Sequence, residues 1–219
     1  MAKPTNELTP MQRQYQQIKE HNQDCILFFR LGDFYEMFNE DAKLAARELD
    51  LTLTSRDRSK PKEEQTPMCG VPYHSVDSYI ARLVQKGYKV AICEQMEDPA
   101  LAQGLVERDI TRIVTPGTVT ESCMLDENKN NYMGCVYGEA GKFGLAFCDV
   151  STGAFFVTLC ADAQSVASEL GRFSPSEVMR FGTDVNSEAI EDALFRRLSC
   201  CVDEGKDGQF SLEDCEALL

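Results

Sequence analysis

The chain has 219 residues, of which 43% are hydrophobic and 26% charged, the proportions of a globular protein with one or two domains and a substantial core. Its apolar runs fall short of the roughly 18 residues that a membrane span needs, and Met1 to Asn6 lead into no hydrophobic signal region, so we expect a cytoplasmic protein. The formal net charge of −14 argues against a general nucleic-acid binder.

The charge is distributed unevenly along the chain. Residues 1–117 contain 15 Lys and Arg against 18 acidic residues, a net charge of −3, whereas residues 118–219 contain 7 against 18, a net charge of −11. The acid excess therefore belongs to the second part. We expect the first part to tolerate contact with phosphates and the second part to be suited to protein contacts.

Ten cysteines are many for a chain of this class. None form a Cys-x-x-Cys pair, and only two histidines are present, which argues against a zinc site. A reducing compartment argues against disulfides. Five cysteines lie in apolar, strand-like runs and are predicted to be small buried hydrophobic residues: Cys25, Cys93, Cys135, Cys148 and Cys160. No function follows for the vicinal pair Cys200 and Cys201.

In the first part, the sequence predicts helices interleaved with strands. Thr9 followed by Pro10 is an N-cap signal for a helix over residues 10–21, and Ser75 is the predicted cap of a helix that ends before Gly87. A further helix is predicted over residues 34–49. Strands are predicted at Cys25–Arg30, Leu51–Thr54, Pro67–Pro72, Tyr88–Cys93 and Asp109–Val114. This order predicts an α/β domain with a mixed sheet over residues 1–117.

The most informative segment is Leu31–Glu36, which follows the apolar run Cys25–Phe29. An aromatic ring such as that of Phe34 can wedge between base steps and kink a duplex, and a nearby carboxylate such as that of Glu36 can accept a hydrogen bond from a base edge. The same residues also fit a helix start, with Asp33 as N-cap and Glu36 completing a capping box. The helical wheel places Phe34 near the margin of the apolar face, which permits an exposed ring without requiring one.

A basic cluster, Arg56, Arg58, Lys60 and Lys62, is interrupted by Asp57 and Pro61. Its composition is typical of a loop that can contact phosphates, although such runs are also common on solvated surfaces. His74 precedes the helix cap and has no evident partner for general-base chemistry, so we interpret it as a local structural residue.

The second part begins after an acidic linker at residues 118–130. Three short strands at Tyr132–Tyr137, Phe143–Val150 and Ala154–Leu159 are joined by tight turns and predict an antiparallel meander. A helix over 163–170, a strand at Val178–Phe181 and a helix over 187–198 follow. This is the order of a ribonuclease-H-like α/β fold, assigned to residues 131–219. Because no helix stop follows Glu216 to Leu219, we expect this domain to be cut short inside a larger protein.

Several segments resemble, in the same order, the N-terminal part of the MutS family of DNA mismatch-repair proteins. In the first part they are Thr9–Tyr15, Phe28–Phe38, Leu51–Thr54, Pro67–His74, Val90–Gln95 and Arg112–Gly117. The resemblance continues more weakly through Gly144–Gly153 and Glu169–Val178, in a region similar to the family's connector domain. It covers the whole chain but only about the front quarter of a typical family member.

The resemblance implies a role for the Phe-x-Glu motif in reading mismatches. Phe34 would stack on the mispaired base from the minor groove and hold the duplex kinked, and Glu36 would hydrogen-bond that base. Wedging a mismatched step costs less than opening a matched one, so deformability supplies much of the discrimination. The charge of Glu36 opposes binding to any duplex and is compensated only where a base offers a donor. Arg56, Arg58 and Lys60 would anchor phosphates.

The resemblance also implies functions outside this chain. Family members carry an ATPase, a clamp and a dimer interface, but no Gly-x-x-x-x-Gly-Lys-[Ser/Thr] motif occurs here, so the chain is not expected to be an enzyme by itself. ATP and Mg²⁺ are expected in the remaining ATPase domain, and a homodimer only in the full-length protein. A MutL-like partner is expected to bind through the connector domain.

Two rival functions remain open. A ribonuclease-H-like hydrolase would use metal-binding carboxylates, and Asp149 before Ser151-Thr152-Gly153 is the nearest candidate. Two-metal chemistry needs several converging acids, however, and Tyr132–Tyr137 has none. The acidic second part also fits a fragment that binds only proteins. Binding of a mismatched duplex by the first part distinguishes these hypotheses.

Overall fold

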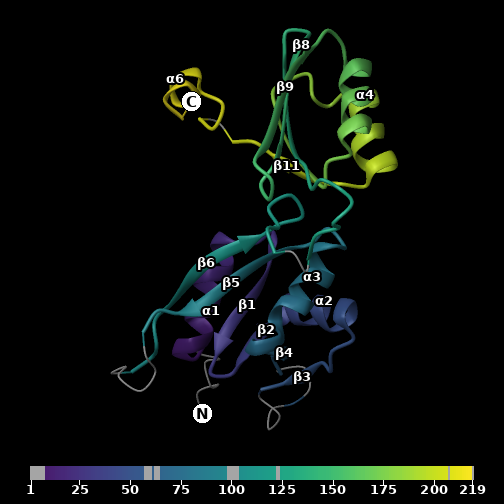
Figure 1. The fold of residues 1–219 in the computed structure, drawn as a ribbon. Helices are drawn as coiled ribbons and strands as arrows, with labels where there is room; N and C mark the ends of the chain where they lie inside the picture. Colours follow the sequence, from purple (N-terminus) through teal and green to yellow (C-terminus); the bar gives the residue numbers. More distant parts are fainter. Residues whose placement is uncertain are drawn as a thin grey trace. The chain divides into compact units, whose positions relative to one another are not determined.

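The computed structural model describes residues 8–56, 61, 65–97, 104–121, 124–206 and 208–218. The chain divides between Val114 and Thr115 into two compact units, unit 1 and unit 2, each built around its own sheet (Figure 1). Both sheets combine parallel and antiparallel neighbours and carry helices, so both units have the predicted mixed α/β class. No helix in the described ranges is long and apolar enough to cross a membrane.

Unit 1 contains a six-stranded sheet with the strand order β3-β4-β2-β1-β5-β6. Strands β1 and β5 are parallel, and the other neighbours are antiparallel. The helical elements are α1 (Pro10–His21), α2 (Asn39–Leu49), the 3-10 turn η2 (Tyr73–Ser75) and α3 (Val76–Val84). The strands are β1 (Cys25–Leu31), β2 (Phe34–Phe38), β3 (Thr54–Ser55), β4 (Pro67–Pro72), β5 (Lys89–Gln95) and β6 (Arg108–Val114).

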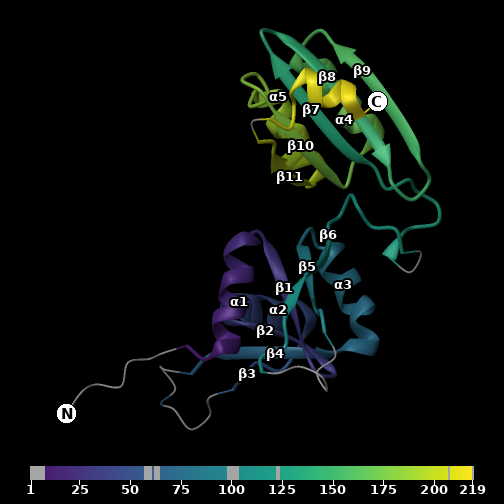
Figure 2. The ribbon, with the colours of Figure 1, turned by 90° about the vertical axis from the view of Figure 1, so that its left-hand side faces the viewer.

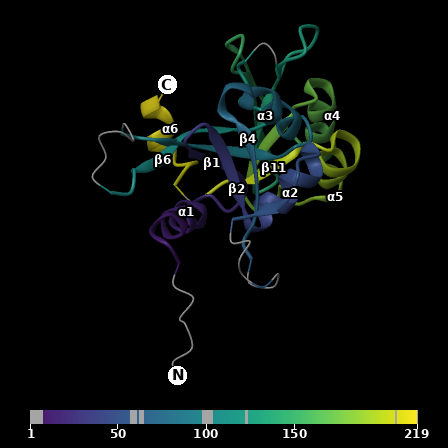
Figure 3. The same cartoon turned by 90° about the horizontal axis from the view of Figure 1, so that it is seen from below.

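The helices cover both faces of this sheet. Helix α1 lies on one face, and α2 and α3 lie on the other (Figures 2 and 3). Tyr15 of α1 packs its ring edge-on against Phe29 of β1 and Phe38 of β2 and forms a core with the cysteines Cys25 and Cys93. The predicted start of α1 is confirmed, because the Thr9 side chain accepts from the Gln12 N–H and the Gln12 side chain accepts from the Thr9 N–H.

The predicted helix over residues 34–49 is wrong in its first third. Phe34–Phe38 form strand β2, and α2 begins only at Asn39. Gly32 adopts φ +59°, which suits a two-residue hairpin turn, and the aromatic-rich β2 then pairs with β1 on one side and β4 on the other. The capping box between Asp33 and Glu36 therefore does not form. Pairing of β2 with its two neighbouring strands thus outweighed a local signal that favoured a helix.

Two smaller expectations also need correction. The strand predicted at Leu51–Thr54 is reduced to the two residues of β3. Ser75 does not cap α3 with its side chain; its hydroxyl donates instead to the carbonyl of Pro72, inside the η2 turn that leads into the helix. The chain thus enters α3 through a tight turn that fixes Tyr73 directly after β4.

Unit 2 contains a five-stranded sheet with the strand order β11-β10-β7-β8-β9. Strands β7 (Met133–Glu139), β8 (Lys142–Asp149) and β9 (Ala154–Cys160) form the predicted antiparallel meander. Strand β10 (Glu177–Phe181) adds in parallel to β7, and β11 (Cys201–Glu204) adds in parallel to β10. Two parallel strands beside the first strand of a meander give the ribonuclease-H-like order that the sequence predicts.

The helices of unit 2 are α4 (Ala163–Phe173), α5 (Glu188–Glu191), the π-helical segment η4 (Asp192–Leu198) and α6 (Leu212–Leu218). Helices α4 and α5 and segment η4 enclose the main core with Val136, Leu145 and Phe147. Phe210, just before α6, stacks on Phe181. Strand β11 and helix α6 are not predicted from the sequence, because the short run Cys201–Glu204 shows no clear alternation.

Candidate functional site

Phe34 stands at the first position of β2, directly after the Gly32–Asp33 turn. It pairs with Leu31 of β1 and with Pro72 of β4, so the strand that carries it is held from both sides. The ring nevertheless keeps 47% of its surface exposed. At the other end of β2, on the same sheet face, Phe38 is buried under Tyr15. An apolar ring is thus presented to solvent from a firmly paired strand.

Glu36 lies two positions along β2 and therefore on the same face as Phe34. Its side chain is only 19% exposed, and its Oε2 lies 3.2 Å from Nη1 of Arg56. Burial raises the pKa of the Glu36 carboxyl group, and the positive charge of Arg56 acts in the opposite direction. The carboxylate is therefore held on the same face as the aromatic ring in a partly desolvated setting, paired with Arg56.

A glycine makes room for this carboxylate. Gly70 of β4 pairs with Glu36, and a Cβ at Gly70 would lie 3.5 Å from Cγ of Glu36 and 3.2 Å from the carbonyl oxygen of Tyr35. A larger residue would press on both atoms. Gly70 thus leaves the Glu36 side chain free to lie over β4, where it meets Arg56.

The structure brings together three of the five predicted site residues: Phe34, Glu36 and Arg56. Arg56 directly follows β3 and is about half exposed. The other two, Arg58 and Lys60, lie outside the described residues. The pairing of Arg56 with Glu36 is not predicted from the sequence, where each residue is assigned separately to DNA. No regular spacing in the sequence links a strand to a basic run 20 positions further along the chain.

Residues behind the hairpin were also missed as functional candidates. Arg30 of β1 and Tyr73 of η2 lie next to the turn, with the guanidinium carbon of Arg30 4.0 Å from the centre of the Tyr73 ring. Arg30 lies in the segment Phe28–Phe38 and Tyr73 in Pro67–His74, two of the segments that resemble the MutS family. The position of Arg30 directly before the Leu-Gly-Asp turn could have indicated that it supports this turn.

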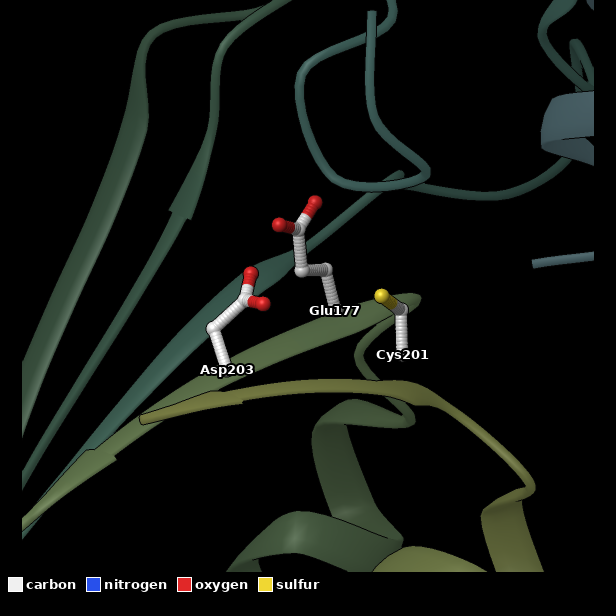
Figure 4. Close-up of side chains that lie close together, drawn as sticks. All are labelled: Glu177, Cys201 and Asp203. Atoms are coloured by element: carbon white, nitrogen blue, oxygen red, sulfur yellow. The ribbon is translucent and has the colours of Figure 1, made fainter. Parts of the chain in front are cut away.

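In unit 2, three potential metal-ligating side chains lie close together: Glu177, Cys201 and Asp203, whose ligand atoms all lie within 4.8 Å of one another (Figure 4). Glu177 is buried, and its Oε2 accepts hydrogen bonds from the Thr115 hydroxyl and, at 2.8 Å, from the Gly117 N–H. Burial raises the pKa of Glu177, as does Asp203 beside it, against the lowering effect of these hydrogen bonds. The Glu177 carboxyl group thereby fastens residues 115–117 to β10.

Asp149, the candidate for hydrolase chemistry, is occupied by its own turn. Its Oδ1 accepts from the N–H and hydroxyl of Ser151 and from the N–H of Thr152, and its Oδ2 accepts from the Asn131 N–H. Burial alone would raise the pKa of Asp149, but these hydrogen bonds outweigh it and hold the pKa below its usual range. The carboxylate orders the β8–β9 turn.

Comparison with known proteins gives two family matches. Residues 9–123 match the model of MutS domain I, and residues 131–219 match that of MutS domain II. The chain is 53% identical over 209 residues to the DNA mismatch repair protein MutS of Acetivibrio thermocellus, covering 94% of this chain and 24% of the relative.

Further relatives carry the same name. The protein of Syntrophomonas wolfei is 50% identical over 214 residues, which cover 96% of this chain and 25% of the relative. That of Staphylococcus saprophyticus is 52% identical over 191 residues, which cover 87% and 21%. The chain thus spans between a fifth and a quarter of the length of these curated relatives.

Proposed function

Because the chain belongs to the MutS family of DNA mismatch repair proteins, we propose that it acts in mismatch repair by binding mismatched double-stranded DNA through unit 1. In this proposal, Phe34 enters the duplex from the minor groove and stacks on the mispaired base, and Glu36 hydrogen-bonds that base. The observation that carries it is the exposed Phe34 ring at the start of a strand paired on both sides.

A strand that is paired on both sides can hold an inserted ring more firmly than the first turn of a helix can. A ring that separates two base steps experiences the restoring force of the stack, and unstacking costs a few kcal/mol per step. Phe34 transmits that force to the backbone of β2, which is hydrogen-bonded to β1 and β4. A mismatched step resists less than a matched one, so the same wedge enters it at lower cost.

Glu36 provides a second means of distinguishing mismatched from fully paired DNA, besides the deformability of the base step. A half-buried carboxylate close to a duplex repels the phosphates, and this repulsion opposes binding to every sequence. A mispaired base that offers a donor to Glu36 compensates for the repulsion. In the free protein Arg56 pairs with Glu36 at 3.2 Å, and because its side chain is about half exposed, we propose that it turns to a phosphate when DNA binds. We assign phosphate anchoring to Arg56, together with Arg58 and Lys60.

Several properties are proposed for the whole protein. The two matched domains include no Walker motif, and we assign ATP and Mg²⁺ binding to a separate ATPase domain of the full-length protein. We assign homodimer formation to the full-length protein as well. A MutL-like partner would bind through unit 2, and a cytoplasmic location accords with a DNA-repair role.

The test compares two duplexes of the same sequence, one fully paired and one with a single mismatch. It uses the full-length form, meaning a MutS protein that carries this chain as its N-terminal region, and measures the ratio of the two dissociation constants by fluorescence anisotropy. Phe34→Ala should remove the preference for the mismatch and leave unit 1 folded, because about half of the ring is exposed in the free protein.

Phe195→Ala is the matched control, since Phe195 lies in unit 2 and is also 47% exposed. It should leave the ratio unchanged. If Phe34→Ala preserves the preference, the wedge is elsewhere; if it unfolds unit 1, Phe34 is a structural residue. Cleavage of the duplex by the unmodified protein with Mg²⁺ but without ATP would instead favour the hydrolase reading.

A further inference from the structure

The turn that carries Phe34 is held from the opposite face of the sheet. Gly32 and Asp33 connect β1 to β2, and the backbone carbonyls of both residues are occupied. Nε of Arg30 donates to the carbonyl of Gly32 at 2.5 Å, and the N–H of Tyr73 donates to the carbonyl of Asp33 at 3.0 Å. The last residues before the wedge are thus tied to a side chain of β1 and to the backbone of η2.

Arg30 is the centre of this arrangement. It pairs with Tyr35 across the hairpin, and because neighbours alternate between faces, its side chain points away from the face of Phe34. The guanidinium carbon lies 4.0 Å from the centre of the Tyr73 ring and 5.3 Å from that of Tyr35. Its Nη1 also lies 3.9 Å from Oε2 of Glu94 on β5.

Tyr35 and Glu94 complete the support. The Tyr35 hydroxyl donates to Oε1 of Glu94, which links β2 to β5 across β1. Burial and the neighbouring Glu94 raise the pKa of Tyr35 to about 12, so this hydroxyl remains a donor at neutral pH. The Arg30 side chain is only 17% exposed, so its stacking on the tyrosine rings takes place largely out of water.

We propose that Arg30, which lies over the Tyr73 ring and near the Tyr35 ring, is the positioning residue of the Phe34 wedge; these three side chains are called the arginine clamp. This inference rests on the proposed function. Arg30 touches no DNA in the proposal; it fixes the Gly32–Asp33 turn so that the stacking force on Phe34 does not bend the hairpin. A wedge that yields would kink the mismatched step less, so the binding of mismatched DNA, and with it the preference for the mismatch, would weaken.

Lysine cannot replace arginine in this role. It keeps the positive charge and its attraction to Glu94, but it has no Nε–H at the position that meets the Gly32 carbonyl and no planar group to lie on the Tyr73 ring. Arg30→Lys therefore removes the clamp without changing the net charge. Tyr73→Leu removes the nearer of the two rings of the clamp, whereas Tyr73→Phe keeps it.

The experiment measures three quantities for each variant of the full-length form. They are the ratio of the dissociation constants for paired and mismatched duplexes, the thermal unfolding midpoint, and the emission of 2-aminopurine placed beside the mismatch, which rises when the base is unstacked. Arg30→Lys and Tyr73→Leu should each lower the ratio about fivefold to tenfold, on the order of the energy with which a stacked, hydrogen-bonded guanidinium resists displacement of the turn. The 2-aminopurine emission should fall in parallel.

The affinity for the fully paired duplex should not change, a result that a loss of folded protein would not give. Tyr73→Phe should keep the full ratio. Arg172→Lys is the matched control, because Arg172 also lies over an aromatic ring, that of Phe173, and pairs with Glu169, but in unit 2. It should leave all three quantities unchanged.

The outcomes separate this inference from the proposed function. If Phe34→Ala removes the preference while Arg30→Lys and Tyr73→Leu retain it, the clamp has no positioning role. If Phe34→Ala retains the preference, the proposed function itself is wrong. If Arg30→Lys lowers the unfolding midpoint, the inference is tested by the ratio of dissociation constants of Tyr73→Leu against that of Tyr73→Phe. Equal ratios for these two variants overturn the inference.

Discussion

At the scale of single residues, Phe34 and Glu36 share one face of β2 but differ in how much water they meet. The ring is about half exposed, whereas the carboxyl group is largely covered and pairs with Arg56. An exposed ring can act on a duplex without rearrangement. A covered carboxylate has already lost part of its hydration, so its interaction with a base or a phosphate is stronger than in open solvent.

Removing the Glu36 carboxylate should weaken discrimination by improving binding to the wrong duplex. Glu36→Ala is expected to raise the affinity for fully paired DNA about threefold to tenfold, since a repulsive charge near phosphates is lost. Affinity for mismatched DNA should change less, because a favourable hydrogen bond is lost together with the repulsion. Anisotropy titrations of both duplexes measure this, and an unchanged ratio would remove Glu36 from recognition.

The raised pKa of Glu36 predicts a pH dependence of the same ratio. As the pH falls toward that pKa, Glu36 gains its proton earlier than an ordinary glutamate and stops repelling phosphates. The ratio should therefore decline in mildly acidic solution. Arg56→Gln removes the charge that lowers this pKa, so the decline should move to higher pH.

The pH profile is measured by repeating the two titrations from about pH 5 to 8. Glu36→Gln is the control, since it cannot titrate and should give a flat profile with a low ratio throughout. A decline that persists in Glu36→Gln would assign the pH dependence to another group.

At the scale of secondary-structure elements, a buried aspartate joins α1, β1 and α2. Asp41 of α2 accepts hydrogen bonds from the Leu27 N–H at 3.0 Å and from the Tyr15 hydroxyl at 3.3 Å, and Nζ of Lys19 lies 3.0 Å from its other oxygen. Burial and the charge of Asp41 raise the pKa of Tyr15 above its usual range, which keeps that hydroxyl a donor. One carboxylate thus aligns the helices on opposite faces of the sheet.

Removal of this carboxylate should destabilise unit 1 strongly. Asp41→Ala leaves the Leu27 N–H, the Tyr15 hydroxyl and the Lys19 ammonium group without their acceptor and is expected to lower the free energy of unfolding by about 2–4 kcal/mol. Urea denaturation of the 219-residue chain measures the effect. Glu40→Ala, next to it but exposed and paired with the exposed Lys43, should change the free energy by less than about 0.5 kcal/mol.

If Asp41→Ala and Glu40→Ala have similar effects, the interactions of Asp41 in the folded state are offset by its desolvation. The network would then specify the position of α1 without stabilising it. In that case the chemical shifts of α1 residues should change although the unfolding midpoint does not.

At the scale of the whole molecule, the two units have separate cores. Leu27 belongs to the core of unit 1, and Leu170 to that of unit 2, and both side chains are fully buried. A cavity in one core should therefore act mainly on its own unit. Leu170→Ala is expected to destabilise unit 2 by about 3 kcal/mol.

Amide hydrogen exchange tests this expectation, because it measures the protection of backbone amides in each unit separately. Leu170→Ala should lower protection in β7, β8 and β10 and leave β1 and β5 unchanged, whereas Leu27→Ala should do the reverse. Equal loss of protection in both units after either substitution would show that the chain unfolds as one cooperative body, contrary to the expectation from two cores.

The predictions of α1, β1, β4, β5 and the β7–β9 meander are confirmed, because each has a local signal. The Thr9-Pro10 cap, the continuous apolar run of β1 and the two tight turns of the meander act over a few residues. The order of strands and helices along unit 2 also predicted the arrangement of its sheet. The Phe-x-Glu motif is likewise a local pattern, so the sequence alone could identify it as a candidate site.

What the sequence left open was settled by pairing between distant segments. Residues 34–38 are predicted as the start of a helix, and the hydrogen bonds of β2 to β1 and β4 make them a strand instead. Glu36 meets Arg56 across 20 positions, and Tyr35 meets Glu94 across 59. Local periodicity carries no information about such contacts, since they depend on which strands become neighbours in the sheet, and that choice is made by the free energy of the whole fold.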